Sequence, residues 1–181
     1  MTMNINYTGI KNSIATTLAS DPRFDVTNMA QRYVRQILKQ RWIGSPPHPY
    51  ILISLSAKAS EQHMAIGYSP FPVLIFSIKT MIQLPPNKDA GVTEIPTALL
   101  TAIGESDIQT PEQADKAVEK ITDAIEEIIR GNSGGLAINR YLNNGQIKVA
   151  LPVATEFNFM KAENKYYIFS EIQLRVEMRL V

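Results

Sequence analysis

The chain has 181 residues, 45% of them hydrophobic and 19% charged, so one globular domain with its own apolar core, residues 1–181, is the expected organisation. It contains no cysteine, which excludes disulfide bonds, thiolate zinc sites and cysteine nucleophiles. The formal net charge of +1 lacks the strong basic excess typical of a dedicated nucleic-acid-binding protein. The first residues, MTMNINYTG, lack the features of a secretory signal, and no apolar run is long enough to span a bilayer. We therefore expect a soluble protein that is neither secreted nor held in a membrane.

Two helices are predicted near the N-terminus. The first covers about residues 8–20, where Ile10, Ile14 and Leu18 form a narrow apolar stripe. Asp21-Pro22 ends it, because the residue before a proline is pushed out of the helical region. The second helix is predicted over about residues 27–42, where apolar residues also recur at helical spacing.

The second predicted helix is basic, and no acidic residue lies between Val26 and Gly44. Its basic residues are Arg32, Arg35, Lys39 and Arg41. Positive side chains at such spacing suit contacts with DNA phosphates. They suit an acidic surface on a neighbouring subunit equally well, and a plain solvated helix face is the third possibility. Of the two functional interpretations we favour the contact with another subunit.

Two strands are predicted after the stiff segment SPPHP at 45–49. The first covers residues 50–56, where Ile51, Ile53 and Leu55 alternate. The second covers residues 72–83, whose apolar start predicts a central strand buried on both faces. Residues 85–109 lack a clear period, and we expect a long loop there with one short helix near 96–103.

The clearest predicted element is a helix over residues 111–130. Thr110 and Gln113 match a capping box, and Gly131 is placed to end the helix. Asp115, Glu119 and Asp123 lie four residues apart, so they could hold a divalent cation, although such runs are usually a solvated helix face.

The last fifty residues are predicted to be β structure. A strand near 136–141 precedes Asn144-Gly145, a strong hairpin signal, and a further short strand begins at Ile147. A long hairpin is then predicted over residues 153–181, turning at 161–165. The fold class that follows is α+β: a mixed, largely antiparallel sheet packed by two or three helices, with a long C-terminal β-hairpin.

The last predicted strand alternates strictly. Apolar residues take one face, and polar residues of alternating charge take the other: Glu171, Gln173, Arg175, Glu177 and Arg179. Charge on a strand commonly prevents unwanted pairing. The alternative is a subunit interface, in which copies add strands to one another or pair charges laterally in a ring.

No catalytic arrangement is recognisable in the sequence. His48 and His63 are expected to be solvated loop residues, without the spacing of metal ligands. No nucleophile elbow occurs, and the glycine-rich segment 131–135 lacks the lysine of a phosphate-binding loop. We expect a protein that is not an enzyme and that has no catalytic residue, cofactor or metal.

The order of the predicted elements, ending in YYIFSEIQLRVEMRLV at 166–181, resembles the head-to-tail connector and tail-terminator proteins of tailed bacteriophages. The resemblance implies a virion structural protein, assembled in the host cytoplasm, that forms a ring, sixfold in symmetry, at the tail end or in the neck. Its implied partners are copies of itself and neighbouring tail-tube, sheath or connector proteins. DNA would pass through the lumen and touch basic residues non-specifically.

Two alternatives to a virion protein remain open at this point. The first is a small DNA-associated or adaptor module that uses the predicted basic helix, with salt-dependent DNA binding as its mark. The second is an enzyme that binds a metal ion through Asp115, Glu119 and Asp123, in which case the metal would raise the melting temperature.

Overall fold

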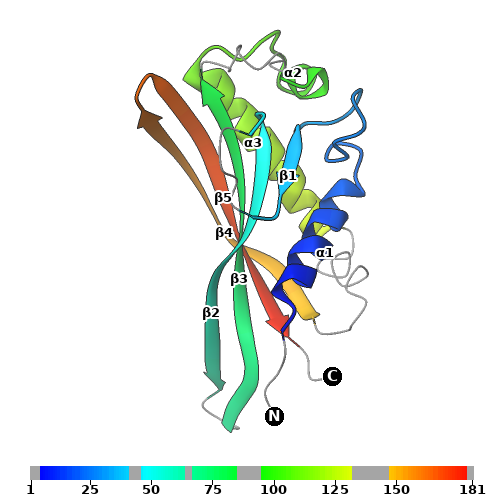
Figure 1. The fold of residues 1–181 in the computed structure, drawn as a ribbon, viewed down its shortest axis with the longest axis vertical. Helices are drawn as coiled ribbons and strands as arrows, with labels where there is room; N and C mark the ends of the chain where they lie inside the picture. Colours follow the sequence, from blue (N-terminus) through cyan, green and yellow to red (C-terminus); the bar gives the residue numbers. More distant parts are fainter. Residues whose placement is uncertain (1–4, 41–45, 64–66, 85–94, 132–146, 179–181) are drawn as a thin grey trace.

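The computed structural model describes residues 5–40, 46–63, 67–84, 95–131 and 147–178 (Figure 1). Its strands are β1 (Gln36–Leu38), β2 (Tyr50–His63), β3 (Gly67–Leu84), β4 (Ile147–Ala162) and β5 (Lys165–Met178). Its helices are α1 (Tyr7–Ala19), α2 (Thr97–Ile103) and α3 (Pro111–Arg130). The strands form one sheet in the order β1-β2-β3-β5-β4, in which only β1 and β2 run parallel. The predicted α+β class, with its mixed sheet and C-terminal hairpin, is confirmed.

Three of the four predicted helices form where the sequence signals place them. α1 begins at Asn6, whose side chain accepts a hydrogen bond from the Gly9 amide at 2.8 Å. α3 begins with the predicted capping box, in which Thr110 and Gln113 each bind the other's backbone amide. α2 matches the short helix predicted in the long loop, of which residues 85–94 lie outside the described residues.

The core lies between one face of the sheet and the helices. α3 packs on β3, β4 and β5, and α1 packs on β2 and on α3. Every second residue of β5 is buried on the helix side of the sheet: Ile168, Ser170, Ile172, Leu174, Val176 and Met178. A buried hydrogen bond of 2.6 Å between the Thr122 and Ser170 hydroxyls joins α3 to the sheet. The predicted central position of β3 is confirmed, because β3 pairs with β2 on one side and β5 on the other.

The second predicted helix, over residues 27–42, is wrong. The Asp25 carboxylate accepts hydrogen bonds from the Thr27 amide (3.0 Å) and hydroxyl (2.6 Å), which fixes a turn where the helix would begin. Further on, the Arg35 amide donates to the Pro49 carbonyl at 2.8 Å, and β1 pairs with β2. The apolar residues at 33–38 fit a short buried strand as well as a helix, and this pairing across the sheet decides between the two.

The hairpin of β2 and β3 is longer than predicted. Its backbone pairing continues from Ala57↔Ile75 to His63↔Gly67, past the last core residue of β2, Ile53. In Figure 1 this part projects beyond the helices as an arm, roughly 20 Å long at the usual rise per strand residue. Residues 57–63 are mostly polar and do not alternate, so the sequence pattern predicted a loop there.

The C-terminal hairpin forms as predicted, with β4 as one strand in place of two. Pairing with β5 shifts register between Pro152 and Ala154, so the segments predicted to start at Ile147 and at Val153 join through an irregularity. The turn lies at residues 163–164, where Glu163 has a left-handed φ of 55°. The strand predicted at 136–141 and the hairpin signal at Asn144-Gly145 lie outside the described residues, as do Arg41 and Arg179.

Candidate interaction surface

One face of the sheet carries none of the described helices, and the polar residues of β5 lie on it. These polar residues are half-buried, and their side chains point away from the core residues of the same strand: Glu171, Gln173, Arg175 and Glu177. Across the pairing with β3, Lys79 stands beside Glu171 and Ser77 beside Gln173. The sequence therefore predicted correctly which side chains of β5 point away from the core. Whether this face joins subunits stays a prediction.

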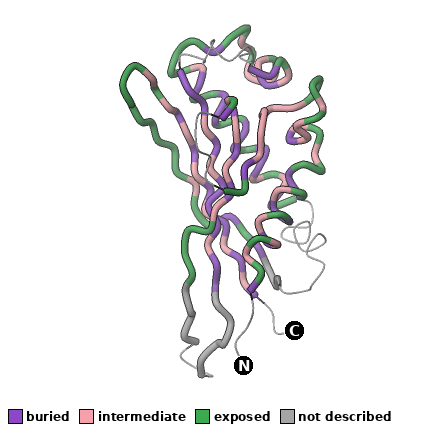
Figure 2. Tube along the Cα trace, viewed as in Figure 1, coloured by how far each residue is buried: buried purple, intermediate pink, exposed green. Residues whose placement is uncertain are grey.

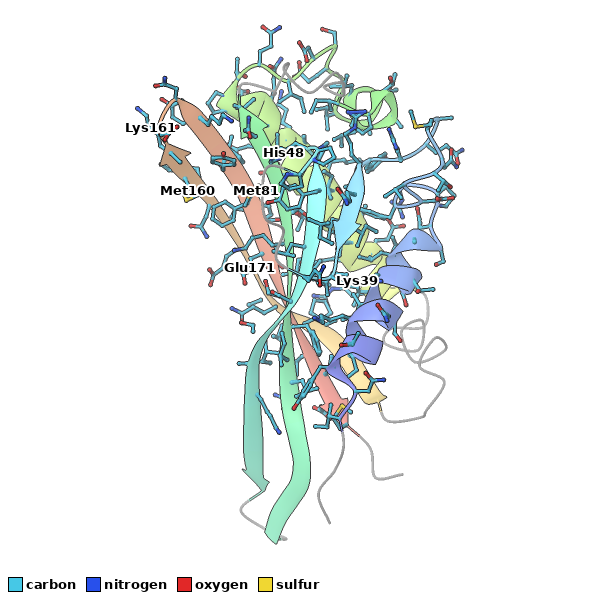
Figure 3. The ribbon with its side chains drawn as sticks, in the orientation of Figure 1. Lys39, His48, Met81, Met160, Lys161 and Glu171 are labelled. Carbon is cyan, nitrogen blue, oxygen red and sulfur yellow. The ribbon has the colours of Figure 1, made fainter. Side chains whose placement is uncertain are left out.

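Within this open face, Glu171 is fixed by its neighbours (Figure 3). A hydrogen bond with the Ser77 side chain and, against the opposing effect of partial burial, the charge of Lys79 hold the pKa of Glu171 below its usual range. Its carboxylate lies 3.3 Å from the Lys79 ammonium, which also sits 5.0 Å from the centre of the Phe169 ring. Further along β5, Arg175 and Glu177 form an ion pair at 3.1 Å. Much of the charge on this face is therefore neutralised within the chain.

β5 is not an edge strand, so it cannot add a strand from another copy. It is paired along its length with β3 on one side and β4 on the other. The sheet edges are β1 and β4. The interpretation of the polar strand as a site of strand addition is therefore wrong for β5. Its backbone groups on one side pair with β4, and those on the other side pair with β3, which is distant in sequence.

An aromatic cluster covers the upper end of the open face. His48 packs against Tyr50, with ring centres 5.1 Å apart, and against Tyr167 at 6.2 Å. Its Nδ1 atom lies 3.3 Å from the Met81 carbonyl oxygen. Burial lowers the pKa of His48 to about 4, despite the opposing effect of that carbonyl, so the ring is neutral at pH 7. His48 lies in a loop as expected, but its ring is half-buried against three neighbours and is not fully solvated. His63 is the last residue of β2.

The end of the β4–β5 hairpin exposes large apolar side chains. Phe157 is 52% exposed and Phe159 is 76% exposed, and this end of the hairpin is largely exposed in Figure 2. Tyr166 lies on the same side of the hairpin, whereas Met160, which pairs with Tyr167, lies on the open side. Phe157 and Phe159 pair in register with Ser170 and Ile168, so they lie on the helix side of the sheet. Sequence analysis did not single them out, although Phe157-Asn-Phe159 repeats an aromatic residue at strand spacing.

A groove of about 480 Å³ runs between this hairpin and α3. Its α3 wall is made by Pro111, Asp115 and Glu119, and its other wall by residues of β4 and β5: Phe157, Asn158, Phe159, Tyr166 and Ile168. Exposed apolar residues that gather in a groove typically mark a contact with another molecule.

The basic residues of the N-terminal region lie around β1. The Arg32 guanidinium donates to the Val26 carbonyl at 2.7 Å, and Arg35 directly precedes β1. Lys39 follows β1, its ammonium is exposed, and its carbonyl accepts a hydrogen bond of 3.0 Å from the Lys11 ammonium. These residues therefore mark one edge of the sheet, without the common face that the predicted helix would have given them.

The predicted acidic row does not make a metal site. Asp115 and Glu119 line the groove, whereas Asp123 does not. Within the described ranges, no three His, Asp or Glu side chains are grouped closely enough to hold a metal ion. Across the same part of the chain, no helix is both long and apolar enough to cross a membrane.

Comparisons with known proteins give a distant structural likeness. No family model matches the sequence, and no curated protein matches it. Among solved structures, the chain is similar to one in the virion of a native gene transfer agent particle, at 14% identity and a TM-score of 0.43. The likeness covers 92% of this chain and 93% of that one.

Proposed function

We propose that this chain is a structural subunit of a tailed-phage virion, and that copies of it close into a ring at the tail end or in the neck. The observation that carries the proposal is the pair of β-hairpins at opposite ends of the sheet: the β2–β3 arm projects beyond the helices, and the end of the β4–β5 hairpin leans away from α3 (Figure 1). A two-stranded hairpin without helix cover is only marginally stable in water. This applies to the arm of β2 and β3, whose far part has no third strand, whereas β5 is paired with β3 as far as Tyr166. The arm therefore has a physical reason to be covered by another molecule.

The exposed aromatic residues support the same proposal. In a single subunit, Phe157 and Phe159 are exposed to water. The free energy of this exposure is unfavourable by roughly 25 cal/mol per Å² of apolar surface. Covering them is favourable, and in a homo-oligomer the first available partner is a second copy. The order of elements resembles the connector and terminator proteins, which implies a ring of about six copies and no active site.

The solution mass of the purified protein tests this function. We expect light scattering after size exclusion to give a closed oligomer of several copies, and negative-stain images to show rings with a central hole. The double variant Phe157→Ser/Phe159→Ser should shift the mass towards the monomer. Its melting temperature at a concentration where both proteins are monomeric should equal that of wild type, because neither ring is in the core. A protein that stays monomeric up to high concentration would contradict self-assembly.

Ring images alone do not identify a virion role. We expect the rings to bind the end of a phage tail tube or a neck assembly, and to co-purify with virions when the gene is expressed during particle assembly. Rings that bind neither structure would contradict the virion role while leaving self-assembly intact.

A further inference from the structure

The groove between α3 and the β4–β5 hairpin combines two kinds of side chain that together favour a cationic partner. On its α3 wall, Asp115 and Glu119 have no ion pair with any residue that the structure describes. On its other wall, Phe157 and Phe159 expose their rings. Carboxylates attract an ammonium or guanidinium group, and aromatic faces add to that attraction when the cation lies over them.

Two basic residues near the groove contact groups other than Asp115 and Glu119. The Lys161 ammonium lies 5.4 Å from the centre of the Tyr166 ring, at the hairpin end. On α3, Lys116 pairs with Glu105 at 3.1 Å. Since neither groove carboxylate is paired among the described residues, both can accept a cation from another molecule.

The opposite edge of the sheet supplies such cations. The order β1-β2-β3-β5-β4 places β1 and β4 at the two edges, and Figure 3 shows Lys39 and Met160 on opposite sides of the sheet. Lys39 and Lys11 meet next to β1, Arg32 lies before it, and no acidic residue occurs between Val26 and Gly44. One edge of the subunit is therefore basic, and the other is acidic and aromatic.

We propose that the basic β1 edge of one copy docks into the α3–hairpin groove of the next copy, with Lys39 and Arg32 facing Asp115 and Glu119. Two different surfaces meet in this contact, so repetition generates a ring if the rotation closes. A symmetric contact of two grooves would bring four carboxylates together, and like charges at an interface are repulsive. This inference rests on the proposed self-assembly and identifies the surfaces that carry it.

Charge-reversal variants test the contact, with oligomer mass measured over a dilution series. The groove variant is Asp115→Lys/Glu119→Lys, and the edge variant is Arg32→Glu/Lys39→Glu. Each should weaken self-association at least about 100-fold, as expected for reversed interface charges. An equimolar mixture should recover large oligomers, because an intact edge then meets an intact groove and the two reversed surfaces also attract each other. The chain that carries all four substitutions should assemble alone.

A matched control changes the same net charge on the same helix outside the groove. Glu112→Lys/Asp123→Lys should leave the oligomer mass unchanged, and circular dichroism should show all variants folded. If both reversals leave the wild-type oligomer intact, the proposed contact is wrong while self-assembly stands. If wild type itself is monomeric, the proposed function fails. If the edge variant loses salt-dependent DNA binding and still assembles, the basic edge binds DNA, and the proposed contact is overturned.

Discussion

The two faces of the sheet are built from the same strands, but one is apolar and buried whereas the other is polar and half-buried. On the helix side of β5, five apolar residues and Ser170 are buried, and the hydroxyl of Ser170 is bonded to Thr122. On the open side, the same strand carries half-buried charges that pair with each other or with Lys79. Burial of the first face stabilises the fold. The second face, whose charges are partly exposed and paired within the chain, adds little to the stability of the monomer.

Neighbouring substitutions on β5 give the largest expected contrast between the faces. Ile172→Ala should lower the free energy of unfolding by about 3 kcal/mol, because it opens a cavity under α3. Gln173→Ala, one residue along and on the open face, should lower it by less than about 0.5 kcal/mol. Chemical denaturation of both variants measures the difference. Equal losses would contradict the division between the faces.

Acid should destabilise the aromatic cluster of the open face. The pKa of His48 is about 4 in the folded protein and near 6.5 when unfolded. The unfolded chain therefore binds more protons between these values, and stability falls as pH decreases from about 6.5 to about 4. The expected loss is about 2 kcal/mol, reduced for the partial exposure of the ring. Asp21 and Glu171, whose pKa values are lowered, add to it at lower pH.

The variant His48→Phe isolates this contribution. It keeps an aromatic ring against Tyr50 and removes the titrating group, so its unfolding free energy should depend less on pH over the same window. Unfolding curves at half-unit pH intervals compare it with wild type. Identical slopes in the two proteins would show that His48 is not buried as described.

Two hydroxyls on the covered face should respond differently to removal. Ser170→Ala breaks the bond with Thr122 and should cost about 1 kcal/mol. The Thr80 hydroxyl is buried and has no hydrogen-bond partner among the described residues, so Thr80→Val should be neutral or slightly stabilising. Thermal unfolding ranks the two variants, and a larger loss for Thr80→Val would reverse the expected order.

The smallest expected effect lies in the ion pair of the open face. Lys79 and Glu171 are 30% and 27% exposed, so the pair is partly screened by solvent. Lys79→Met should cost about 0.5 kcal/mol at low salt, and the cost should vanish in about 1 M salt. A salt-independent loss above about 2 kcal/mol would mean that this face takes part in folding as the covered face does.

The sequence predicted the elements whose signals are local. α3 carries its capping box and apolar face within one segment, and the alternation of β5 identifies both of its faces. Residues 27–42 were assigned wrongly because their apolar spacing fits both a helix and a strand, and the pairing with β2 is nonlocal. The arm of β2 and β3 escaped prediction because residues 57–63 are mostly polar and do not alternate.

The candidate interaction surface was predicted only in part. The acidic row of α3 and the basic residues near β1 are visible in the sequence, and so is their complementarity. The position of Phe157 and Phe159 beside Asp115 depends on how β4 pairs with β5 and on where α3 crosses the sheet. Neither feature has a local signal, so the groove could not be assembled from sequence patterns.

Hydrogen exchange at two protein concentrations tests the central claim most directly, which is that the covered face folds the subunit and the uncovered surfaces join copies. On assembly, amides at the end of the β4–β5 hairpin and around β1 should gain protection. Amides of α3 and those facing it in β3 and β5 should exchange equally slowly in both samples, because their burial does not depend on a partner. An oligomer in which the hairpin end and β1 gain no protection would contradict the account.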